Sequence, residues 1–113
     1  MIERRDVYRC ALGDNGEGIQ SGTRPVLIVS NNIGNKHAKI LIVAPITSKR
    51  KTQLPTHFDI KLERKSTVLC EQLTIVHKSK LFDKMYSLNE ADLDELDKAL
   101  TVSLGIGKRG TNE

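Results

Sequence analysis

The stretch "SGTRPVLIVSN" (residues 21–31) places a charged arginine and a proline directly before four aliphatic residues. The aliphatic run at 26–29 predicts a buried strand, and Pro25 can occupy only the start or the edge of such a strand. A guanidinium at the end of a buried strand is costly unless water or an anion satisfies it. Arg24 is therefore either an edge charge that points into solvent or a residue held at the mouth of a site.

Further short strands are predicted on both sides of this stretch, and no crossover helices separate them. The predicted order is a strand at 6–12, a glycine-rich loop at 13–22, the strand from Pro25, a turn at 32–35, strands at 39–46, 56–62 and 67–76, and a short helical turn and strand within 78–88. This pattern favours a small, strongly bent antiparallel sheet or barrel of five or six strands.

The last element is predicted to be an amphipathic helix. Leucines between 93 and 104 recur at steps of three and four residues and make one apolar face. Ser87 and Glu90 have the spacing of a capping box, and Gly105 marks the end of the helix. The predicted fold class is therefore mainly β (α+β), with a C-terminal helix that packs on the sheet.

Length and composition favour a globular protein. The 113 residues are 38% hydrophobic and 28% charged, which predicts a single domain over 1–107 and a flexible tail at 108–113. No apolar run reaches the roughly 20 residues that cross a bilayer, and "MIERRDVYRC" (1–10) has no signal-peptide core, so we expect no membrane contact and a cytoplasmic location. Cys10 and Cys70 are expected to be small buried hydrophobes.

Charge is unevenly distributed along the chain, whose net charge is +4. The segments "SKRK" (48–51) and "HKSK" (77–80) are basic, whereas "DLDELD" (92–97) contains four acids. A positive middle suits a polyanionic partner such as nucleic acid or an acidic protein segment. A solvated surface of lysines is the simpler alternative.

Several catalytic signatures are missing from the sequence. It contains no P-loop, GxGxxG, HExxH or GxSxG motif, and the three histidines do not have a metal-ligand spacing. These absences disfavour an NTPase, a zinc hydrolase and a Ser-His-Asp hydrolase. We expect no metal and no cofactor.

Three polar residues end or interrupt apolar strands: Arg24, Thr47 and Gln72. In a small curved sheet, the ends of neighbouring strands can meet at one rim. An arginine fork can bind two oxygens of a phosphodiester, and a threonine hydroxyl can donate to the same group. Such a pair could stabilise the negative charge that develops on a reacting phosphorus.

Three segments share their order and spacing with a known family: "RPVLIVSNNIGNKHAKILIVAPITSK" (24–49), "LPTHFDI" (54–60) and "EQLTIVHKSKL" (71–81). Together they resemble the MazF/PemK (Kid) family of toxin endoribonucleases. The resemblance implies an SH3-like small β-barrel of the CcdB/Kid/MazF type, a homodimer, and metal-independent, sequence-specific cleavage of single-stranded mRNA. The substrate's 2′-OH would attack the phosphorus and leave a 2′,3′-cyclic phosphate and a 5′-OH end.

The resemblance also implies site residues. Arg24 and Thr47 correspond to the catalytic pair. Residues of the loops and strand ends are predicted to contact RNA: Gln20, Ser48, Lys49, Arg50, His57 and Gln72. His57 is in addition a titratable candidate for proton transfer, with a structural role as the alternative.

Two departures from the family pattern stand out. Ile19 and Gln20 replace an acid–glutamine pair that precedes the arginine in many members, so the role of that acid is either empty here or falls to Glu17. Arg5 replaces the glycine that usually follows the first basic residue. We expect this second change to affect only a loop.

The resemblance implies a cognate antitoxin whose acidic, disordered C-terminal segment covers the basic surface. Two other functions remain open from the sequence. The CcdB toxins share this fold and inhibit DNA gyrase by protein contact, and a plain RNA-binding barrel would bind RNA without cutting it.

Overall fold

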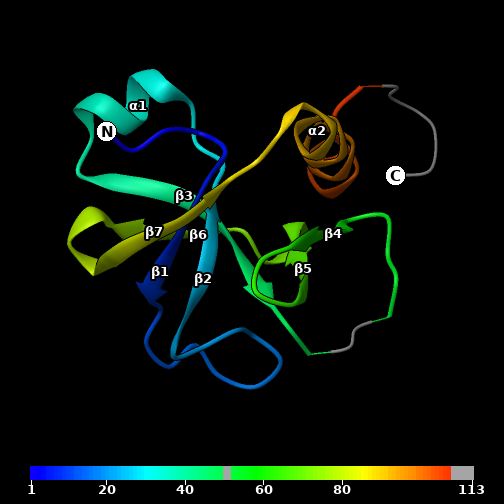
Figure 1. The fold of residues 1–113 in the computed structure, drawn as a ribbon, viewed down its shortest axis with the longest axis horizontal. Helices are drawn as coiled ribbons and strands as arrows, with labels where there is room; N and C mark the ends of the chain where they lie inside the picture. Colours follow the sequence, from blue (N-terminus) through cyan, green and yellow to red (C-terminus); the bar gives the residue numbers. More distant parts are fainter. Residues whose placement is uncertain (50–51, 108–113) are drawn as a thin grey trace.

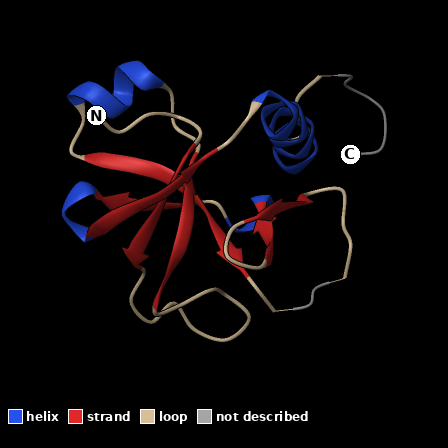
Figure 2. Cartoon of the chain, viewed as in Figure 1, coloured by secondary structure: helices blue, strands red, loops and turns tan. Residues whose placement is uncertain are grey.

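The computed structural model describes residues 1–49 and 52–107, and the predicted tail at 108–113 lies outside the described residues. Within the described ranges, seven strands, two α-helices and two 3₁₀ turns follow one another (Figures 1 and 2). Their bounds are β1 (Asp6–Ala11), β2 (Thr23–Ile28), α1 (Asn32–His37), β3 (Ile40–Thr47), β4 (His57–Lys61), β5 (Lys65–Leu69), η1 (Cys70–Gln72), β6 (Thr74–His77), η2 (Lys78–Lys80), β7 (Leu81–Ser87) and α2 (Glu90–Leu104).

The sheet bends around β3, which changes its partner along its length. Residues 43–45 of β3 pair with β2 on one side, while 40–43 pair with β6 and 46–47 with β5 on the other. All strand pairs are antiparallel, and the order β4-β5-β3-β2-β1-β7 leaves β4 and β7 as the two ends. The result is a curled half-barrel, and the predicted mainly-β class with a C-terminal helix is confirmed.

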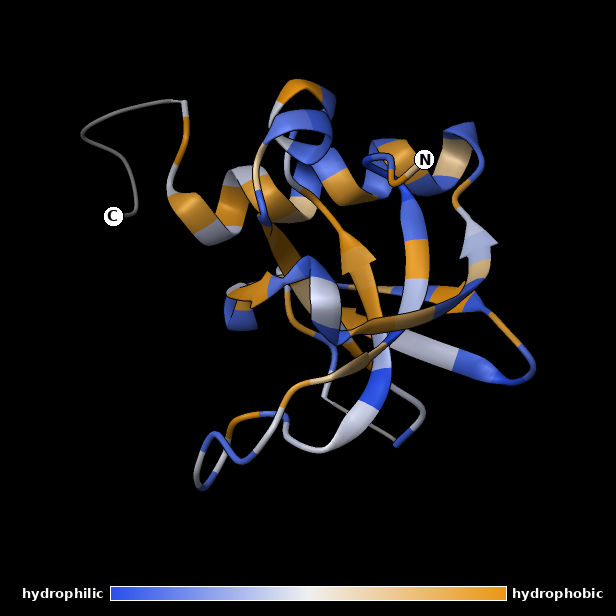
Figure 3. Cartoon of the chain, turned by 90° about the vertical axis from the view of Figure 1, so that its left-hand side faces the viewer, coloured by the Kyte–Doolittle hydropathy of each residue, from blue (hydrophilic) through white to orange (hydrophobic). Residues whose placement is uncertain are grey.

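Buried side chains form two clusters, one on each face of the curled sheet. The first, the α2 cluster, lies where α2 packs against the sheet and includes Leu96 of α2 and Leu27 of β2. The second cluster includes Val26 and Ile28 of β2. Both faces of β2 are therefore buried, which explains why its sequence is a continuous apolar run rather than an alternating one. Figure 3 shows the contrast between the apolar central strands and the largely polar loop below them.

Each cluster contains one of the two cysteines, and both thiols are free. Cys70 belongs to the α2 cluster and Cys10 to the second cluster, and neither is exposed. Burial raises the pKa of the Cys10 thiol. Burial, together with the neighbouring Glu71, raises the pKa of Cys70 to about 12. Both side chains therefore behave as small hydrophobes, in agreement with the prediction.

Two predicted elements differ in the structure. The segment predicted as one strand at 67–76 is divided into β5, η1 and β6, because the chain turns at Cys70–Gln72. The segment predicted as a turn at 32–35 belongs to helix α1, whose cap Asn31 accepts a hydrogen bond from the Gly34 amide at 2.8 Å. A helix of six residues is too short to produce a readable periodicity.

The capping box at Ser87 and Glu90 was predicted wrongly. Ser87 is the last residue of β7, and α2 begins at Glu90 with Asn89 as its cap. Asn89 accepts from the Asp92 amide at 2.8 Å, and the Asp92 carboxylate accepts from the Asn89 amide at 3.4 Å. The predicted end is confirmed, because Gly105 has a left-handed φ of 64°. No helix in the described part of the chain is long and apolar enough to cross a membrane.

Arg5 has a φ of 103°, in the region that favours glycine. Its side chain offsets this strain by donating to the Leu88 carbonyl from Nε at 3.0 Å and from Nη2 at 2.6 Å. Arg5→Ala keeps the strain and loses both hydrogen bonds, whereas Arg5→Gly loses the hydrogen bonds but removes the strain. We expect the glycine variant to be more stable than the alanine variant by about 1–2 kcal/mol in urea unfolding.

Wild-type protein should be at least as stable as either variant, since charged hydrogen bonds to a carbonyl contribute about 1.5–3 kcal/mol. Equal stability of Arg5→Ala and Arg5→Gly would contradict a strained backbone at this position.

Candidate active site

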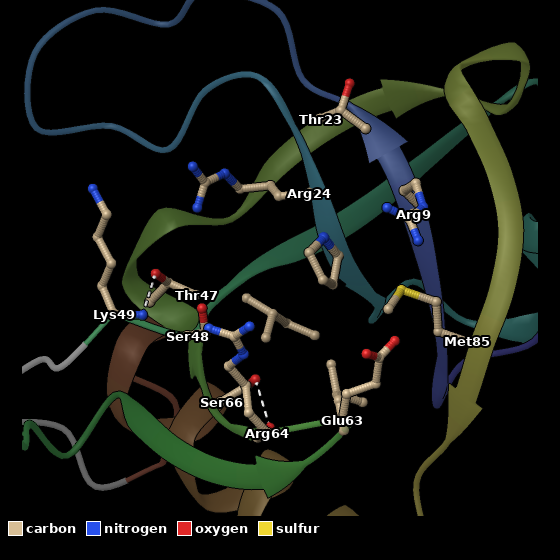
Figure 4. Close-up of a pocket in the computed structure, with 13 residues that line it drawn as sticks. Arg9, Thr23, Arg24, Thr47, Ser48, Lys49, Glu63, Arg64, Ser66 and Met85 are labelled. Carbon is tan, nitrogen blue, oxygen red and sulfur yellow. Dashed lines mark hydrogen bonds between the residues drawn. The ribbon is translucent and has the colours of Figure 1, made fainter.

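A pocket of about 410 Å³ opens where β2 begins and β3 ends (Figure 4). Its walls come from β1, β2, β3 and the two residues after it, the turn between β4 and β5, β5 itself, and β7. The lining residues are Arg9, Thr23, Arg24, Pro25, Ile46, Thr47, Ser48, Lys49, Leu62, Glu63, Arg64, Ser66 and Met85. The structure therefore brings together four predicted site residues: Arg24, Thr47, Ser48 and Lys49.

Strand register explains why Arg24 and Thr47 meet. Val26 of β2 pairs with Pro45 of β3, and the same register, continued toward the start of β2, sets Arg24 level with Thr47. These two residues are distant in sequence but stand at the same rim of the sheet. The apolar runs that follow Arg24 and precede Thr47 hold both backbones in the core.

Arg24 is half-buried and partly fixed. Its Nε donates to the Ser21 carbonyl at 2.8 Å, which orients the guanidinium. The hydrogen bonds among the described residues leave both of its terminal nitrogens unused, so they can bind an anion. Arg24 therefore lies at the mouth of a pocket, and its catalytic role stays a prediction.

Thr47 is only 2% exposed, and its Oγ1 accepts from the Lys49 amide at 3.1 Å. Because that bond uses the oxygen as an acceptor, the hydroxyl proton can be donated to a ligand in the pocket. Figure 4 shows the Arg24 and Lys49 side chains extending toward the same side of the pocket.

Sequence reasoning missed Arg9 and Arg64, which add positive charge to the same pocket. Arg64 extends from the β4–β5 turn into the pocket, and Arg9 is the cross-strand partner of Pro25. The cationic side chains outnumber the one lining carboxylate, that of Glu63. The basic turn around Arg64 could have been noticed in the sequence, but the position of Arg9 follows only from the pairing of β1 with β2.

Three of the predicted RNA contacts lie elsewhere. Gln20, His57 and Gln72 do not line the pocket. The His57 side chain is 4% exposed and is held between two acceptors, with Nε2 2.8 Å from a Glu71 oxygen and Nδ1 2.9 Å from the Thr52 carbonyl. This placement matches the structural alternative for His57.

Gln72 and Gln20 contact each other rather than the pocket. The Gln72 Oε1 accepts from the Gln20 amide at 2.9 Å, and its Nε2 donates to the Gly18 carbonyl at 3.3 Å. Glu17, the candidate for the missing acid, is exposed and is not part of the pocket lining, and Arg50 lies outside the described residues.

Glu71 has a pKa below its ordinary value. Burial alone would raise this pKa, but hydrogen bonds from His57, its own backbone and Thr56, together with the charge of His57, outweigh burial and lower it. A carboxyl whose pKa is depressed by folding stabilises the fold above the unfolded pKa of about 4.3, and the stabilisation is lost as the pH falls through the folded value.

Glu71→Gln should therefore flatten the acid side of the stability profile. We expect the thermal midpoint of the wild type to fall more steeply than that of the variant between about pH 5 and about pH 3. The matched control is Glu95→Gln, because Glu95 forms only an exposed ion pair with Lys98 on α2. The control should keep the wild-type slope, and a Glu71→Gln profile as steep as the wild type would contradict the assignment.

Comparison of the sequence with known protein families identifies the family to which the chain belongs. The profile of a family described as PemK-like, MazF-like toxin of type II toxin–antitoxin system matches residues 3–104. The chain belongs to the PemK/MazF toxin family. The matched range of this PemK/MazF domain includes every residue that lines the pocket.

Relatives and solved structures agree with the PemK/MazF assignment. Endoribonuclease MazF of Staphylococcus epidermidis is 40% identical over 112 residues, which cover 94% of this chain and 93% of the relative. An endoribonuclease solved in complex with its cognate antitoxin from mycobacterial species superposes with a TM-score of 0.80 at 28% identity, covering 96% of this chain and 99% of the other. MazF of Deinococcus radiodurans, at 19% identity, shares the fold with a TM-score of 0.80 over 93% of this chain and 97% of the other.

Proposed function

We propose that this PemK/MazF protein is an endoribonuclease toxin that cleaves single-stranded mRNA at specific sequences, in the Arg24–Thr47 pocket. The observation that carries the proposal is the meeting of Arg24 and Thr47 at one pocket, where the charged lining residues are four cations and one carboxylate. A phosphodiester is the ligand that suits an arginine fork, a threonine hydroxyl and further positive charge. The name of the S. epidermidis relative supports the same activity.

The proposed reaction is a transesterification within the RNA. The 2′-oxygen forms a bond to the adjacent phosphorus, the bond from phosphorus to the 5′-oxygen breaks, and the products are a 2′,3′-cyclic phosphate and a 5′-OH end. The 2′-OH loses its proton and the 5′-oxygen gains one. The two terminal nitrogens of Arg24 would bind non-bridging oxygens, and Thr47 would donate to the same phosphoryl group as its negative charge grows.

We infer that no metal takes part, because the guanidinium supplies the positive charge beside the phosphorus. Neither the general base nor the general acid is assigned to a residue. The contacts of His57 with Glu71 and Thr52 favour a structural role for that histidine.

The proposal includes two protein partners. Because related endoribonucleases were solved with a cognate antitoxin, we propose that an acidic, disordered segment of such a partner covers the cationic pocket. We also propose a homodimer. Ile42 of β3 and Ile75 of β6 are cross-strand neighbours that are 43% and 62% exposed, and Ile40 beside them is 49% exposed. Such an apolar sheet face is a suitable contact for a second copy, and sedimentation equilibrium would give the mass.

The test is incubation of purified protein with a long single-stranded RNA, both in the presence and in the absence of EDTA. We expect cleavage at a short recurrent sequence, with cyclic-phosphate ends that cannot accept a 5′-phosphorylated strand in ligation until the phosphate is opened and removed to leave a 3′-OH. Intact RNA would contradict the endoribonuclease assignment, and cleavage that disappears with the chelator would contradict metal independence. Inhibition of DNA gyrase without RNA cleavage would support the alternative, which the family relatives named endoribonuclease do not favour.

A further inference from the structure

Gln72 connects two segments that lie far apart in the sequence. Both ends of its amide are used: Oε1 accepts from the Gln20 amide, and Nε2 donates to the Gly18 carbonyl. The segment it binds is the loop between β1 and β2, which lies at the lower end of the molecule in Figure 1. Gln72 thus holds the backbone of the loop that precedes the catalytic arginine.

Gln72 adds an external support to a loop that also has hydrogen bonds of its own, such as that from the Gly22 amide to the Gly13 carbonyl at 2.7 Å. Gly16 and Gly18 both have positive φ values, and a chain with such residues gains much conformational freedom if it is not held. Within the loop, the Gln20 carbonyl accepts from Asn15 Nδ2 at 2.8 Å, and the Ser21 hydroxyl accepts from the Asn15 amide at 2.8 Å. These hydrogen bonds order the part of the loop next to Arg24 around Gln20, whose amide donates to Gln72.

The support itself is rigid. Gln72 belongs to η1, whose first residue, Cys70, donates its amide to the Thr56 carbonyl at 3.0 Å. The Cys70 carbonyl accepts from the Ser103 hydroxyl of α2 at 2.7 Å. Glu71 accepts from Thr56 at 3.0 Å and lies 2.8 Å from His57 Nε2. These contacts fix η1 to α2 and to the start of β4.

A short path then leads from Gln72 to the Arg24 side chain. Gln72 binds the amide of Gln20, the next residue is Ser21, and the Ser21 carbonyl accepts from Arg24 Nε at 2.8 Å. We propose that Gln72 is a positioning residue, which fixes the direction of the Arg24 guanidinium through the backbone of residues 20 and 21. The proposal rests on the proposed function for its effect on cleavage, but not for its effect on the loop.

The first test observes the loop without any RNA. In Gln72→Ala, the exchange of the Gln20 amide with solvent should become at least about tenfold faster, because its acceptor is gone. The Arg24 Nε–H signal in the NMR spectrum should also shift or broaden. The matched control is Gln53→Ala, since Gln53 is exposed, contacts Asp59 at 3.4 Å and takes no part in η1 or in the pocket. The control should leave both signals unchanged.

A second variant distinguishes the loss of this hydrogen bond from unfolding of the whole protein. Gln72→Glu keeps an oxygen acceptor for the Gln20 amide, but it replaces the donor to Gly18 by a carboxylate oxygen that faces the Gly18 carbonyl. We expect the Gln20 amide to remain protected in this variant. Unchanged exchange at Gln20 in a folded Gln72→Ala protein would overturn the proposal, whether or not the chain cleaves RNA.

The third measurement concerns cleavage. Gln72→Ala should lower kcat about 10- to 100-fold, because small misplacement of a catalytic group costs about 10²-fold. KM should change much less, since the variant does not remove an RNA contact. In an Arg24→Ala background, the same change should have no further effect, because its whole influence passes through Arg24.

Two results would overturn the proposal and indicate direct contact of Gln72 with RNA. One is a double variant in which the rate losses of Gln72→Ala and Arg24→Ala multiply, and the other is a Gln72→Ala variant that changes mainly KM. If the wild type does not cleave RNA at all, the proposed function fails. The positioning role is then decided by the Gln20 amide and the Arg24 Nε–H signal alone.

Discussion

Replacing Arg24 by alanine is expected to lower the rate of RNA cleavage about 10³-fold, because a guanidinium at a phosphoryl transition state contributes about 10³- to 10⁵-fold and a single oxyanion donor about 10²- to 10³-fold. The fold should remain, since Arg24 is half-buried and, among residues 1–49 and 52–107, its side chain makes one hydrogen bond, to the Ser21 carbonyl. Single-turnover cleavage of a short RNA that contains the recognised sequence would measure the loss. Thermal unfolding would check the fold.

Two further variants make this result specific. Arg24→Lys keeps the charge but not the planar fork, so we expect it to recover only part of the rate. Arg4→Ala is the matched control, because Arg4 pairs with Asp97 of α2 and does not line the pocket. It should cleave within about twofold of the wild type. An Arg24→Ala protein that cleaves as fast as the Arg4→Ala control would remove the basis of the proposed chemistry.

Replacing Thr47 by valine is expected to lower kcat about 10²-fold, because valine has a similar shape but cannot donate to the phosphoryl group. The cost in stability should be small. The Lys49 amide loses its acceptor, but Lys49 is exposed and water can satisfy it. Rate and thermal midpoint together therefore separate a loss of chemistry from a loss of fold.

Thr47→Ser is the companion variant, since it keeps the hydroxyl and removes only a methyl group. We expect Thr47→Ser to cleave much faster than Thr47→Val. If Thr47→Val cleaves as fast as the wild type while Thr47→Ser is slowed, then the buried methyl group matters and the hydroxyl does not, and Thr47 would be a packing residue.

Much of the fold could be predicted from the sequence because its signals are local. The continuous apolar run of β2 marked a strand buried on both faces, and the leucine spacing marked α2. Gly105 marked the end of that helix, because the residue that follows the last helical turn has a left-handed φ, which glycine adopts without strain. The helix start was misjudged, since serine and asparagine are both good caps and the geometry of β7 decides between Ser87 and Asn89.

The site could be predicted only in part. Arg24 and Thr47 were singled out by their places at strand ends and were assigned the catalytic role by resemblance, and the pairing of β2 with β3 brings them together. Arg9 enters the pocket through the register of β1, which no local pattern encodes. Gln72 was predicted to contact RNA, but both ends of its amide bind the β1–β2 loop. A polar residue in an apolar segment indicates a buried partner, yet the sequence does not say whether that partner is substrate or backbone.

The two free thiols lie in different halves of the interior, so each can report when its own half opens. Cys70 belongs to the cluster beneath α2 and Cys10 to the cluster on the opposite face, so each half of the interior contains one reactive atom of its own. A maleimide cannot reach either sulfur until the surrounding half opens. Mass spectrometry of the two cysteine peptides therefore reports, from the natural sequence and without any inserted label, which half of the toxin comes apart first.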